Sequence, residues 1–376
     1  SYVRAIDRIW ENIVGKKIYI TGGIGARHEG EAFGDNYELP NLTAYNETCA
    51  AIGNVYTNYR LFLLHGDAKY FDVLERTLYN GLISGVSLDG GRFFYPNPLA
   101  CDGKYRFNAD HTITRQPWFG CACCPSNISR FIPSLPGYVY AVKDDKVYVN
   151  LFLSNRAKLK VNGKNVVLEQ ETSYPWNGDI RLTVAKGNQP FVMNVRIPGW
   201  VRGSVLPGGL YSYADGEELA YRVSVNGQEV KGALQKGYLS IDRRWKKGDV
   251  VEIHFDMQPR VVKANDKVAA DRGRVAIECG PLVYCAEWPD NDFDISTLLL
   301  NRHPKFQVVE HPDLLGGINE ITTRAQALSY DATGRLAAKD VKLTLIPYYA
   351  WAHRGEGRME VWLPIEVGAA SAELQE

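Results

Sequence analysis

Apolar residues recur at helical spacing in the first third of the chain. Between Tyr2 and Val14 they lie three and four positions apart, which predicts an amphipathic helix. A second helix is predicted from Asn46 to Leu64, because His65-Gly66-Asp67 is typical of a helix C-terminus, and a third from about Ala68 to Ser84. The positions expected to face inward are Val3, Ile6, Ile9, Trp10 and Ile13 in the first helix, Cys49, Ile52, Tyr56, Tyr59 and Leu63 in the second, and Tyr70, Phe71, Leu74, Leu78 and Leu82 in the third.

Beyond Gly137 the apolar period changes from 3.6 residues to two, which predicts β-strands. The dipeptide Asn226-Gly227, directly after an alternating segment, is typical of a hairpin turn. Predicted strands include Val147–Leu151, Ile180–Val184, Val192–Ile197, Val250–Phe255, Val275–Cys279, Leu282–Tyr284, Val341–Leu345 and Met359–Leu363. The C-terminal two thirds is therefore predicted to form two β-sandwiches divided near Pro259.

The change of period predicts a multidomain α+β protein. Its 376 residues are enough for two or three domains. We expect residues 1–137 to be the C-terminal part of a helical domain, residues 138–258 a β-sandwich domain, and residues 259–376 a second β-sandwich domain. About four helices precede the sheets, which is too few to enclose a core. We therefore expect further helices upstream, in a longer protein.

Composition and charge limit the classes of binding partner and the cellular compartment that can be expected. Lys plus Arg and Asp plus Glu both number 43, so the balance excludes a basic footprint for nucleic acid or anionic lipid. No apolar run is long enough to span a membrane, and the first residues lack signal-peptide features. Seven cysteines, an odd number, argue against a disulfide framework. A cytoplasmic location and a neutral polymer or small molecule as partner are expected.

Three of the seven cysteines lie within four positions, in the segment Gly120–Asn127. Adjacent thiols bridge to each other poorly, so a soft-ligand cluster is favoured over a disulfide. Glu47 and Cys49 offer a carboxylate and a further thiol, and with Cys123 and Cys124 they form a set suited to tetrahedral zinc. The alternative is a buried helix cysteine and an incidental pair. A closed zinc site of this kind is structural by default, but a zinc-held thiolate can also be a nucleophile.

Three further side chains are candidates for chemistry. Glu31, between glycines and an aromatic residue, is a candidate general acid if partial burial raises its pKa, and a solvated loop glutamate otherwise. Glu75 follows Leu74 on the third helix, where a salt bridge to an arginine is the simpler interpretation. Tyr95 can be a core residue or offer its hydroxyl to a ligand. Gly23-Ile24-Gly25 completes no nucleotide-binding pattern and is expected to line a pocket.

Several ordered motifs resemble the bacterial β-L-arabinofuranosidases of glycoside hydrolase family 127 and close relatives. The resemblance covers nearly the whole chain and is more specific for the superfamily than for the substrate. The motifs are Tyr19-Ile20-Thr21-Gly22-Gly23-Ile24-Gly25, Gly30-Glu31-Ala32-Phe33-Gly34, Tyr37-Glu38-Leu39-Pro40-Asn41, Glu47-Thr48-Cys49-Ala50, Leu78-Tyr79-Asn80-Gly81, Tyr95-Pro96-Asn97-Pro98, Cys123-Cys124-Pro125, Arg196-Ile197-Pro198-Gly199-Trp200, Gly280-Pro281-Leu282-Val283-Tyr284-Cys285 and Ile346-Pro347-Tyr348-Tyr349-Ala350-Trp351.

The resemblance implies part of an (α/α)6 helical toroid, as the catalytic domain, followed by the two β-sandwiches. It also implies a zinc ion held by Glu47, Cys49, Cys123 and Cys124. In that family the thiolate matching Cys123 attacks the anomeric carbon, and the glutamate matching Glu31 protonates the leaving oxygen and later activates water. Configuration is retained through a thioglycosyl intermediate, without the usual pair of carboxylates. Glu75 and Tyr95 would bind sugar hydroxyls, with further sugar-binding side chains on helices that precede Ser1.

Together these observations predict a retaining glycosidase that releases terminal β-L-arabinofuranose, or a related sugar, from plant-type glycans. The expected partner is a small sugar or oligosaccharide, with no nucleic acid and no membrane, and a homodimer is left open. One alternative is a non-catalytic, zinc-stabilised carbohydrate-binding protein or an inactive fragment. Another is a zinc-stabilised scaffold with no sugar partner. Replacing Cys123 with serine separates the first interpretation from the others.

Overall fold

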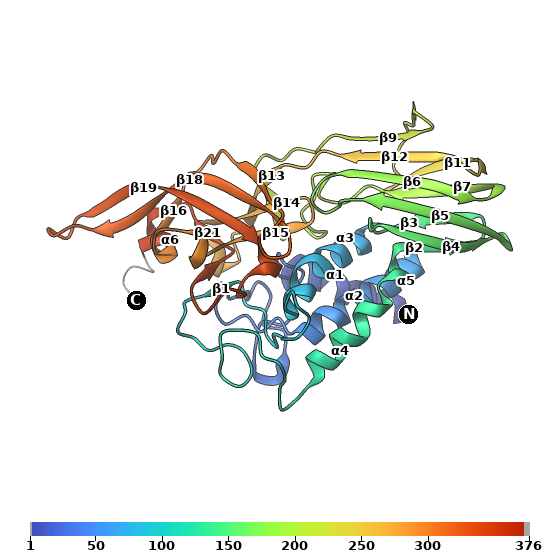
Figure 1. The fold of residues 1–376 in the computed structure, drawn as a ribbon. Helices are drawn as coiled ribbons and strands as arrows, with labels where there is room; N and C mark the ends of the chain where they lie inside the picture. Colours follow the sequence, from blue (N-terminus) through green and yellow to red (C-terminus); the bar gives the residue numbers. More distant parts are fainter. Residues whose placement is uncertain (1, 372–376) are drawn as a thin grey trace.

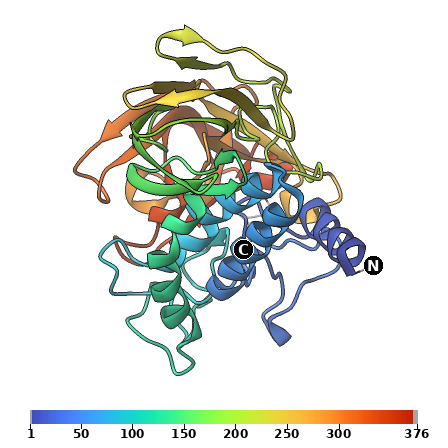
Figure 2. The ribbon, with the colours of Figure 1, turned by 90° about the vertical axis from the view of Figure 1, so that its right-hand side faces the viewer.

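The computed structural model describes residues 2–371. Helices and long loops form one side of the molecule, and three β-sheets form the rest (Figure 1). After a rotation by 90°, the helices lie beneath the sheets (Figure 2). This arrangement confirms the predicted α+β class with a sheet-rich C-terminal part. No helix among residues 2–371 is long and apolar enough to cross a membrane.

The three predicted helices are confirmed, but Val3, Ile6 and Ile9, which were expected to face inward, are exposed. The helices are α1 (Tyr2–Lys16), α2 (Thr48–His65) and α3 (Lys69–Arg76), and α3 continues through a π-helical turn (Thr77–Leu82) into a 3-10 turn (Ile83–Gly85). α2 ends where the Gly66 N–H donates to the Phe62 carbonyl, with Gly66 in the left-handed conformation at φ 63°. Two more helices, α4 (Cys123–Phe131) and α5 (Pro136–Val139), lead into the sheets.

The predicted inward face of α2 is wrong in part. Tyr56 and Leu63 are 38% and 56% exposed. The buried face instead includes two polar side chains, and the Trp10 indole N–H donates to Asn58 Oδ1 at 2.7 Å. A pattern of apolar residues counts asparagine as outward-facing, so it misplaces a helix whose core contacts include hydrogen-bonded amides. The buried residues of α2 are Thr48, Ala51, Ile52, Asn54, Val55, Asn58, Leu61 and Phe62.

The middle of the chain forms two sheets. All their neighbouring strands are antiparallel except β3 and β7, which are parallel. The four-stranded sheet has the order β11 (Tyr238–Lys246), β7 (Asn188–Arg196), β3 (Lys146–Val149) and β2 (Tyr140–Lys143). The six-stranded sheet has the order β10 (Gln228–Glu229), β9 (Tyr221–Val225), β12 (Val250–Phe255), β6 (Asp179–Lys186), β5 (Lys164–Thr172) and β4 (Asn155–Val161).

The C-terminal strands belong to one connected eleven-stranded sheet. Two of its strands come from earlier parts of the chain, since β1 pairs with β20 and β8 pairs with β13. Contacts therefore cross the predicted boundary near Pro259, and the predicted strand Met359–Leu363 is two short strands. The members are β1 (Ala100–Cys101), β8 (Tyr211–Tyr213), β13 (Pro259–Ala264), β14 (Arg274–Cys279), β15 (Leu282–Glu287), β16 (Leu298–Leu300), β17 (Gln307–His311), β18 (Ile318–Tyr330), β19 (Leu336–Pro347), β20 (Met359–Glu360) and β21 (Leu363–Pro364), and α6 (Val367–Ser371) follows.

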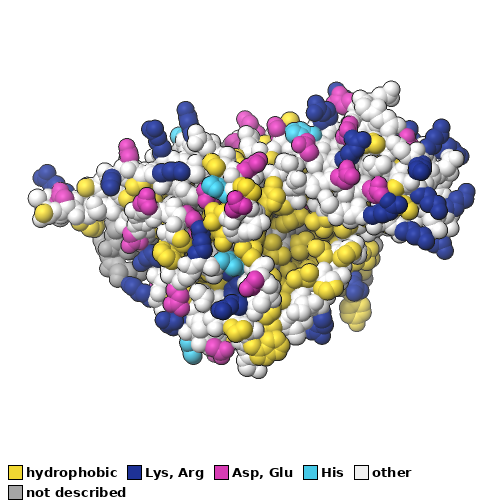
Figure 3. Space-filling model, in the orientation of Figure 1, with side chains coloured by type: hydrophobic (Ala, Val, Ile, Leu, Met, Phe, Trp, Pro, Cys, Tyr) yellow, Lys and Arg dark blue, Asp and Glu magenta, His cyan; other side chains and the backbone are white. Residues whose placement is uncertain are grey.

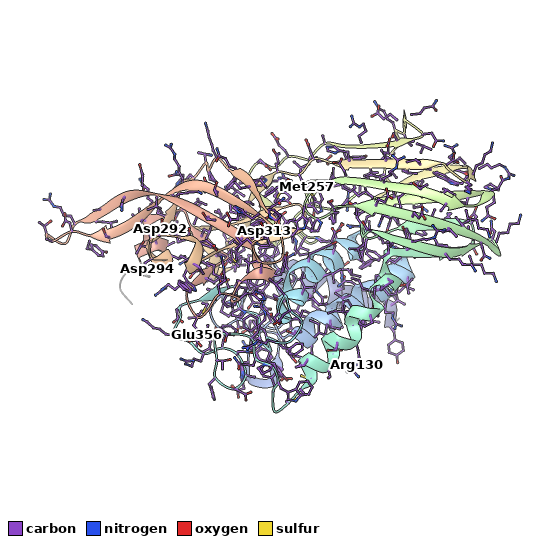
Figure 4. The ribbon with its side chains drawn as sticks, viewed as in Figure 1. Arg130, Met257, Asp292, Asp294, Asp313 and Glu356 are labelled. Carbon is purple, nitrogen blue, oxygen red and sulfur yellow. The ribbon has the colours of Figure 1, made fainter. Side chains whose placement is uncertain are left out.

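Met257 lies where the middle sheets and the C-terminal sheet meet (Figure 4). Its methyl carbon would lie 2.6 Å from a Cβ added at Gly280, in the turn between β14 and β15, and Gly280 has φ 57°. A side chain at Gly280 would therefore displace Met257 as well as strain the backbone.

Two adjacent residues on α3 attach the helices to both sheet regions. Glu75 forms a buried ion pair with Arg196 on β7, and Arg76 pairs with Glu278 on β14 at 2.6 Å. All four side chains are at most 3% exposed. Because buried charges are tolerated only when they are paired, these contacts fix α3 relative to the sheets. α3 packs in turn against α2, whose N-terminus carries Glu47 and Cys49.

Candidate metal and thiolate site

The structure brings together the four predicted metal ligands. One carboxylate oxygen of Glu47 and the sulfurs of Cys49, Cys123 and Cys124 all lie within 4.8 Å of one another. Glu47 Oε1 accepts from the thiols of Cys123 and Cys124 at 3.4 Å each, and those two sulfurs are 3.8 Å apart. Residues separated by more than 70 positions in the sequence thus form one cluster that could hold a metal ion.

Two helix N-termini position this cluster. Glu47 is the N-cap of α2 and Cys49 its second residue, while Cys123 and Cys124 begin α4. Helix N-termini carry positive potential, so both helices favour anionic sulfur and carboxylate at this place. Glu47 and Cys124 are buried, and Cys49 and Cys123 are half-buried. The cluster is therefore largely shielded from solvent, and two of its four residues are partly exposed.

A loop anchors the segment that carries Glu47. The Thr48 N–H donates to the Tyr95 carbonyl at 2.9 Å, and the Thr48 hydroxyl donates to the Phe94 carbonyl at 2.8 Å. The Asn97 amide donates to the Asn46 carbonyl and to the Thr48 hydroxyl, each at 3.0 Å. These bonds hold the entry to α2 in place, so Glu47 and Cys49 are fixed before any ligand binds.

The ionisable groups of the cluster and their burial shift the pKa values of its thiols. A hydrogen bond from Cys124 is the main cause that lowers the pKa of Cys49 to about 7. Burial raises the pKa of Cys123 to about 12, and the hydrogen bond to Cys49 together with burial raises that of Cys124 further. One thiol therefore ionises near neutral pH, and a second negative charge is costly without a cation. A bound cation removes this cost, which is the behaviour expected of a metal-ligand set.

Tyr95 contacts the sulfur that is predicted to be the nucleophile. Its hydroxyl oxygen lies 2.9 Å from the Cys123 sulfur and 3.8 Å from that of Cys121. Burial is the main cause that raises the pKa of Tyr95, so the phenol keeps its proton. It can then donate to a thiolate at Cys123, and this hydrogen bond opposes the effect of burial on the pKa of that thiol.

Glu31 is hydrogen-bonded to Tyr45, a residue that the sequence patterns did not single out. The Tyr45 hydroxyl donates to Glu31 Oε1 at 3.0 Å, and the Tyr45 and Tyr95 ring centroids are 6.2 Å apart. Glu31 is exposed, which matches the alternative of a solvated loop glutamate and not partial burial. Its backbone is left-handed at φ 49°, an uncommon conformation for glutamate. In the sequence, the only hint that Tyr45 lies near the site is its position two residues before Glu47.

Glu75 lies in a different environment. Its carboxylate is 2% exposed, pairs with Arg196 and accepts from the Tyr174 hydroxyl at 2.8 Å. Burial is the main cause that raises the pKa of Glu75. This placement matches the salt-bridge alternative and gives a sugar no access to the carboxylate, so the predicted sugar-binding role of Glu75 is corrected to a structural one.

The glycine-rich segment 22–25 packs against the π-helical turn after α3. A Cβ at Gly22 would lie 2.5 Å from Thr77, and the Gly81 N–H donates to the Thr21 carbonyl at 2.9 Å. Glycine here permits close approach of two backbones, in a position with φ 78°. Gly22 therefore serves close packing, while the Gly25 carbonyl accepts from the Asn46 N–H at 2.8 Å, next to Glu47. The expected pocket lining stays a prediction.

Comparison with known proteins supplies the family. Residues 1–137 match the β-L-arabinofuranosidase GH127 catalytic domain, residues 146–257 the GH127 middle domain, and residues 259–364 the glycoside hydrolase family 127 C-terminal domain. The chain belongs to glycoside hydrolase family 127. A curated relative, the non-reducing end β-L-arabinofuranosidase of Bifidobacterium longum subsp. longum, is 37% identical over 94% of this chain and 54% of its own length.

Solved structures of family 127 members have the same fold. A GH127 β-arabinofuranosidase is 74% identical with a TM-score of 0.95, over 98% of this chain and 57% of that one. A GH127 β-L-arabinofuranosidase from Geobacillus stearothermophilus T6 is 40% identical with a TM-score of 0.86, over 94% of this chain and 55% of that one. The chain thus spans about half the length of these relatives.

Proposed function

We propose that the protein containing this chain is a retaining glycosidase that releases terminal β-L-arabinofuranose from plant-type glycans. The observation that carries this proposal is the gathering of Glu47, Cys49, Cys123 and Cys124 beside the Tyr95 hydroxyl. Family membership supports the reaction class, since the relatives described above are named β-L-arabinofuranosidases or β-arabinofuranosidases. The choice of β-L-arabinofuranose as the sugar rests on the names of those relatives.

The cluster is proposed to bind zinc through its carboxylate and three sulfurs. With Zn–S and Zn–O distances of about 2.3 and 2.0 Å, tetrahedral geometry separates two sulfurs by about 3.8 Å and a sulfur from an oxygen by about 3.5 Å. The two sulfurs of Cys123 and Cys124 are 3.8 Å apart and each lies 3.4 Å from Glu47 Oε1. Zinc, when bound, keeps the sulfurs deprotonated at neutral pH.

In the proposed first step the Cys123 sulfur attacks the anomeric carbon as the bond from that carbon to the leaving oxygen breaks. The Glu31 carboxyl gives its proton to that oxygen. In the second step the Glu31 carboxylate takes a proton from water, whose oxygen attacks the same carbon, and the sulfur leaves as a thiolate. Two displacements at one carbon retain its configuration. Tyr95 donates to the thiolate, and its place beside Cys123 also suits contact with a sugar hydroxyl.

A non-catalytic sugar-binding protein is the second candidate. The observation in its favour is that three sulfurs and a carboxylate complete a four-coordinate shell, as in structural zinc sites. It differs from the first candidate in requiring neither Cys123 nor Glu31 for binding.

Metal analysis tests the cluster. We expect about one zinc ion per chain in the full-length protein and its loss in Cys124→Ser, because serine does not replace a thiolate ligand. Cys121→Ser is the matched control, since Cys121 is exposed and lies outside the four-residue cluster. Elemental analysis of the purified variants makes the measurement. Full zinc content in Cys124→Ser, or none in the unaltered protein, would reject the zinc proposal.

The role of Tyr45 predicts a dependence on the leaving group. Tyr45→Phe should lower kcat/KM for an alkyl β-L-arabinofuranoside by roughly 10- to 100-fold, because Glu31 loses its only recorded hydrogen-bond donor among the described residues. The 4-nitrophenyl glycoside should change much less, since 4-nitrophenolate leaves without a proton. Tyr59→Phe is the control, because within residues 2–371 the Tyr59 hydroxyl bonds only the Gly137 carbonyl, at 3.3 Å. Equal losses for both substrates would show that Tyr45 does not position the acid.

We also propose that α1 to α4 belong to an (α/α)6 toroid and that the sheets form two β-sandwiches. Apolar side chains gather over the helices and below the middle sheets (Figure 3). Ile9, Leu63 and Leu64 are 56% to 60% exposed on α1 and α2, which is costly for large apolar groups in water. Further helices of the full-length protein would cover them, and a full-length structure with these side chains in solvent would contradict this. The cytoplasmic location and the homodimer remain predictions.

A further inference from the structure

Several turns of the middle sheets meet at one end of the molecule. The Asn162 N–H donates to the Asp144 carbonyl, which joins the turn between β4 and β5 to that between β2 and β3. The Gln189 amide donates to the Val161 carbonyl, and Lys246 pairs with Asn188 across β11 and β7. The turns after β6 and β11 therefore lie at the same end, which we call the basic end (residues 143–146, 158–164, 186–189 and 242–249).

The basic end carries most of its charge as lysine. Its ten cations are Lys143, Lys146, Lys158, Lys160, Lys164, Lys186, Arg243, Arg244, Lys246 and Lys247, and its four acids are Asp144, Asp145, Asp242 and Asp249. The net formal charge there is +6, in a chain whose total is zero. Lys and Arg side chains accordingly crowd the right-hand end of the surface (Figure 3). The neutral total therefore hides a strongly asymmetric distribution.

These cations are available to a partner. All are exposed except Arg243, which is half-buried. Among the residues that the structure describes, Arg243 is also the only one of the ten with an ion pair, to Asp249 at 3.7 Å. Like charges held close together on a rigid set of turns repel one another, and a polyanion that neutralises several of them relieves this repulsion.

We propose that the basic end binds a carboxylated polysaccharide, a polyuronate, that carries or accompanies the sugar to be cleaved. The choice of a glycan rests on the proposed function, whereas the preference for a polyanion rests on the charges alone. Lysines on several separate turns suit a chain of carboxylates spaced along a polymer better than one small anion, because each contact is weak and many act together. The expectation of a neutral polymer, made from the total charge, changes accordingly.

Two other classes of polyanion fit less well. Single-stranded nucleic acid is held by base stacking on aromatic side chains, and the only aromatic residue in the basic end is Trp245, which is fully buried. Membrane surfaces are usually held by basic residues together with apolar or aromatic anchors, and the turns here consist of Lys, Asp, Asn and Gly. A polar, hydrated polymer needs neither feature.

A simpler explanation of the lysines on β4 is edge protection. β4 is the edge strand of the six-stranded sheet, and lysines on edge strands discourage pairing with other chains. That explanation accounts for Lys158 and Lys160. β11 is likewise an edge strand, of the four-stranded sheet, so edge protection also accounts for Lys246. It does not account for Lys164 on β5 and Lys186 on β6, which are interior strands of the six-stranded sheet.

Charge reversal tests the proposal in the full-length protein. The variant Lys160→Glu, Lys164→Glu, Lys246→Glu, Lys247→Glu should bind polygalacturonate at least about 10-fold more weakly at 50 mM salt, and the salt dependence of Kd should become shallower. The matched control, Lys263→Glu, Lys305→Glu, Lys339→Glu, Lys342→Glu, changes the net charge equally on exposed positions of the C-terminal sheet region and should bind as the unaltered protein does. Affinity electrophoresis and calorimetry give the Kd.

The outcomes separate this proposal from the proposed function. Binding is measured without turnover, and hydrolysis of a small aryl arabinofuranoside should be equal in both variants, because the basic end does not contribute to the cluster. No binding of polygalacturonate by the unaltered protein, or equal weakening in both variants, overturns the proposal. Tighter binding to duplex DNA or to vesicles with anionic phospholipid than to polygalacturonate overturns it too. If the unaltered protein binds polygalacturonate but does not hydrolyse the arabinofuranoside, the proposed glycosidase function is contradicted and the polyuronate proposal stands.

Discussion

Replacing Cys123 with serine is expected to lower kcat/KM for an aryl β-L-arabinofuranoside by about 10⁴-fold or more in the full-length protein. The Cys123 sulfur lies at the N-terminus of α4 and 2.9 Å from the Tyr95 hydroxyl, and both features favour its thiolate against the effect of burial. The Cys123 side chain is only half-buried. Serine retains a similar shape but remains protonated at neutral pH, and therefore lacks the anionic nucleophile. Steady-state kinetics with the aryl glycoside makes the measurement.

Serine at this position also removes a proposed metal ligand, so a second variant separates the two effects. Glu31→Gln leaves the cluster intact, because Glu31 bonds Tyr45 and is not one of the four converging residues. With a 4-nitrophenyl substrate it should accumulate the enzyme with one pentosyl unit on Cys123, since water is no longer activated. Intact mass spectrometry after mixing detects this species. Unmodified protein in Glu31→Gln, together with full activity in Cys123→Ser, would refute covalent catalysis by this cysteine.

The residue types suggested the cluster, and the resemblance to family 127 implied its four members. Spacing alone left open an incidental cysteine pair, because it does not show that Glu47 and Cys49 meet Cys123 and Cys124; the structure brings the four side chains together. The change of apolar period near Gly137 likewise predicted where helices give way to sheets, since periods of 3.6 and two residues reflect different backbones.

The features that the sequence did not reveal depend on tertiary contacts. In the sequence Tyr45 does not differ from other aromatic residues, and only the folded loop shows its hydrogen bond to Glu31. Asn58 is predicted to face outward because it is polar, but in the structure it accepts a hydrogen bond from Trp10. The charge of the basic end emerges only when turns far apart in the sequence meet, because a total charge sums over all faces. Sequence patterns therefore located the reactive group better than its surroundings.

Replacing Arg196 with methionine is expected to destabilise the protein by about 3 to 5 kcal/mol, because it leaves the buried Glu75 carboxylate without its cation. Arg196 is fully buried and donates to Asp72 at 3.0 Å, to Glu75, and to the Asn150 carbonyl at 2.7 Å. Asp72 keeps Arg202 as a partner at 2.6 Å, whereas in the described part of the chain Glu75 keeps only the Tyr174 hydroxyl. The cost should therefore arise mainly at Glu75. Urea unfolding midpoints provide the measurement.

The pH dependence identifies Glu75 as the cause. Burial already raises the pKa of Glu75, and loss of Arg196 raises it further. A carboxyl whose folded pKa exceeds its unfolded pKa binds its proton more tightly when folded, so its effect on stability worsens as pH rises between the two values. The variant should thus lose more stability at pH 8 than at pH 5, and adding Glu75→Gln should restore most of it. Arg181→Met, which breaks an exposed pair with Glu252, should cost less than about 1 kcal/mol. A loss that is independent of pH and unchanged by Glu75→Gln would assign the stabilisation to packing around Phe152, whose ring lies 5.6 Å from the guanidinium.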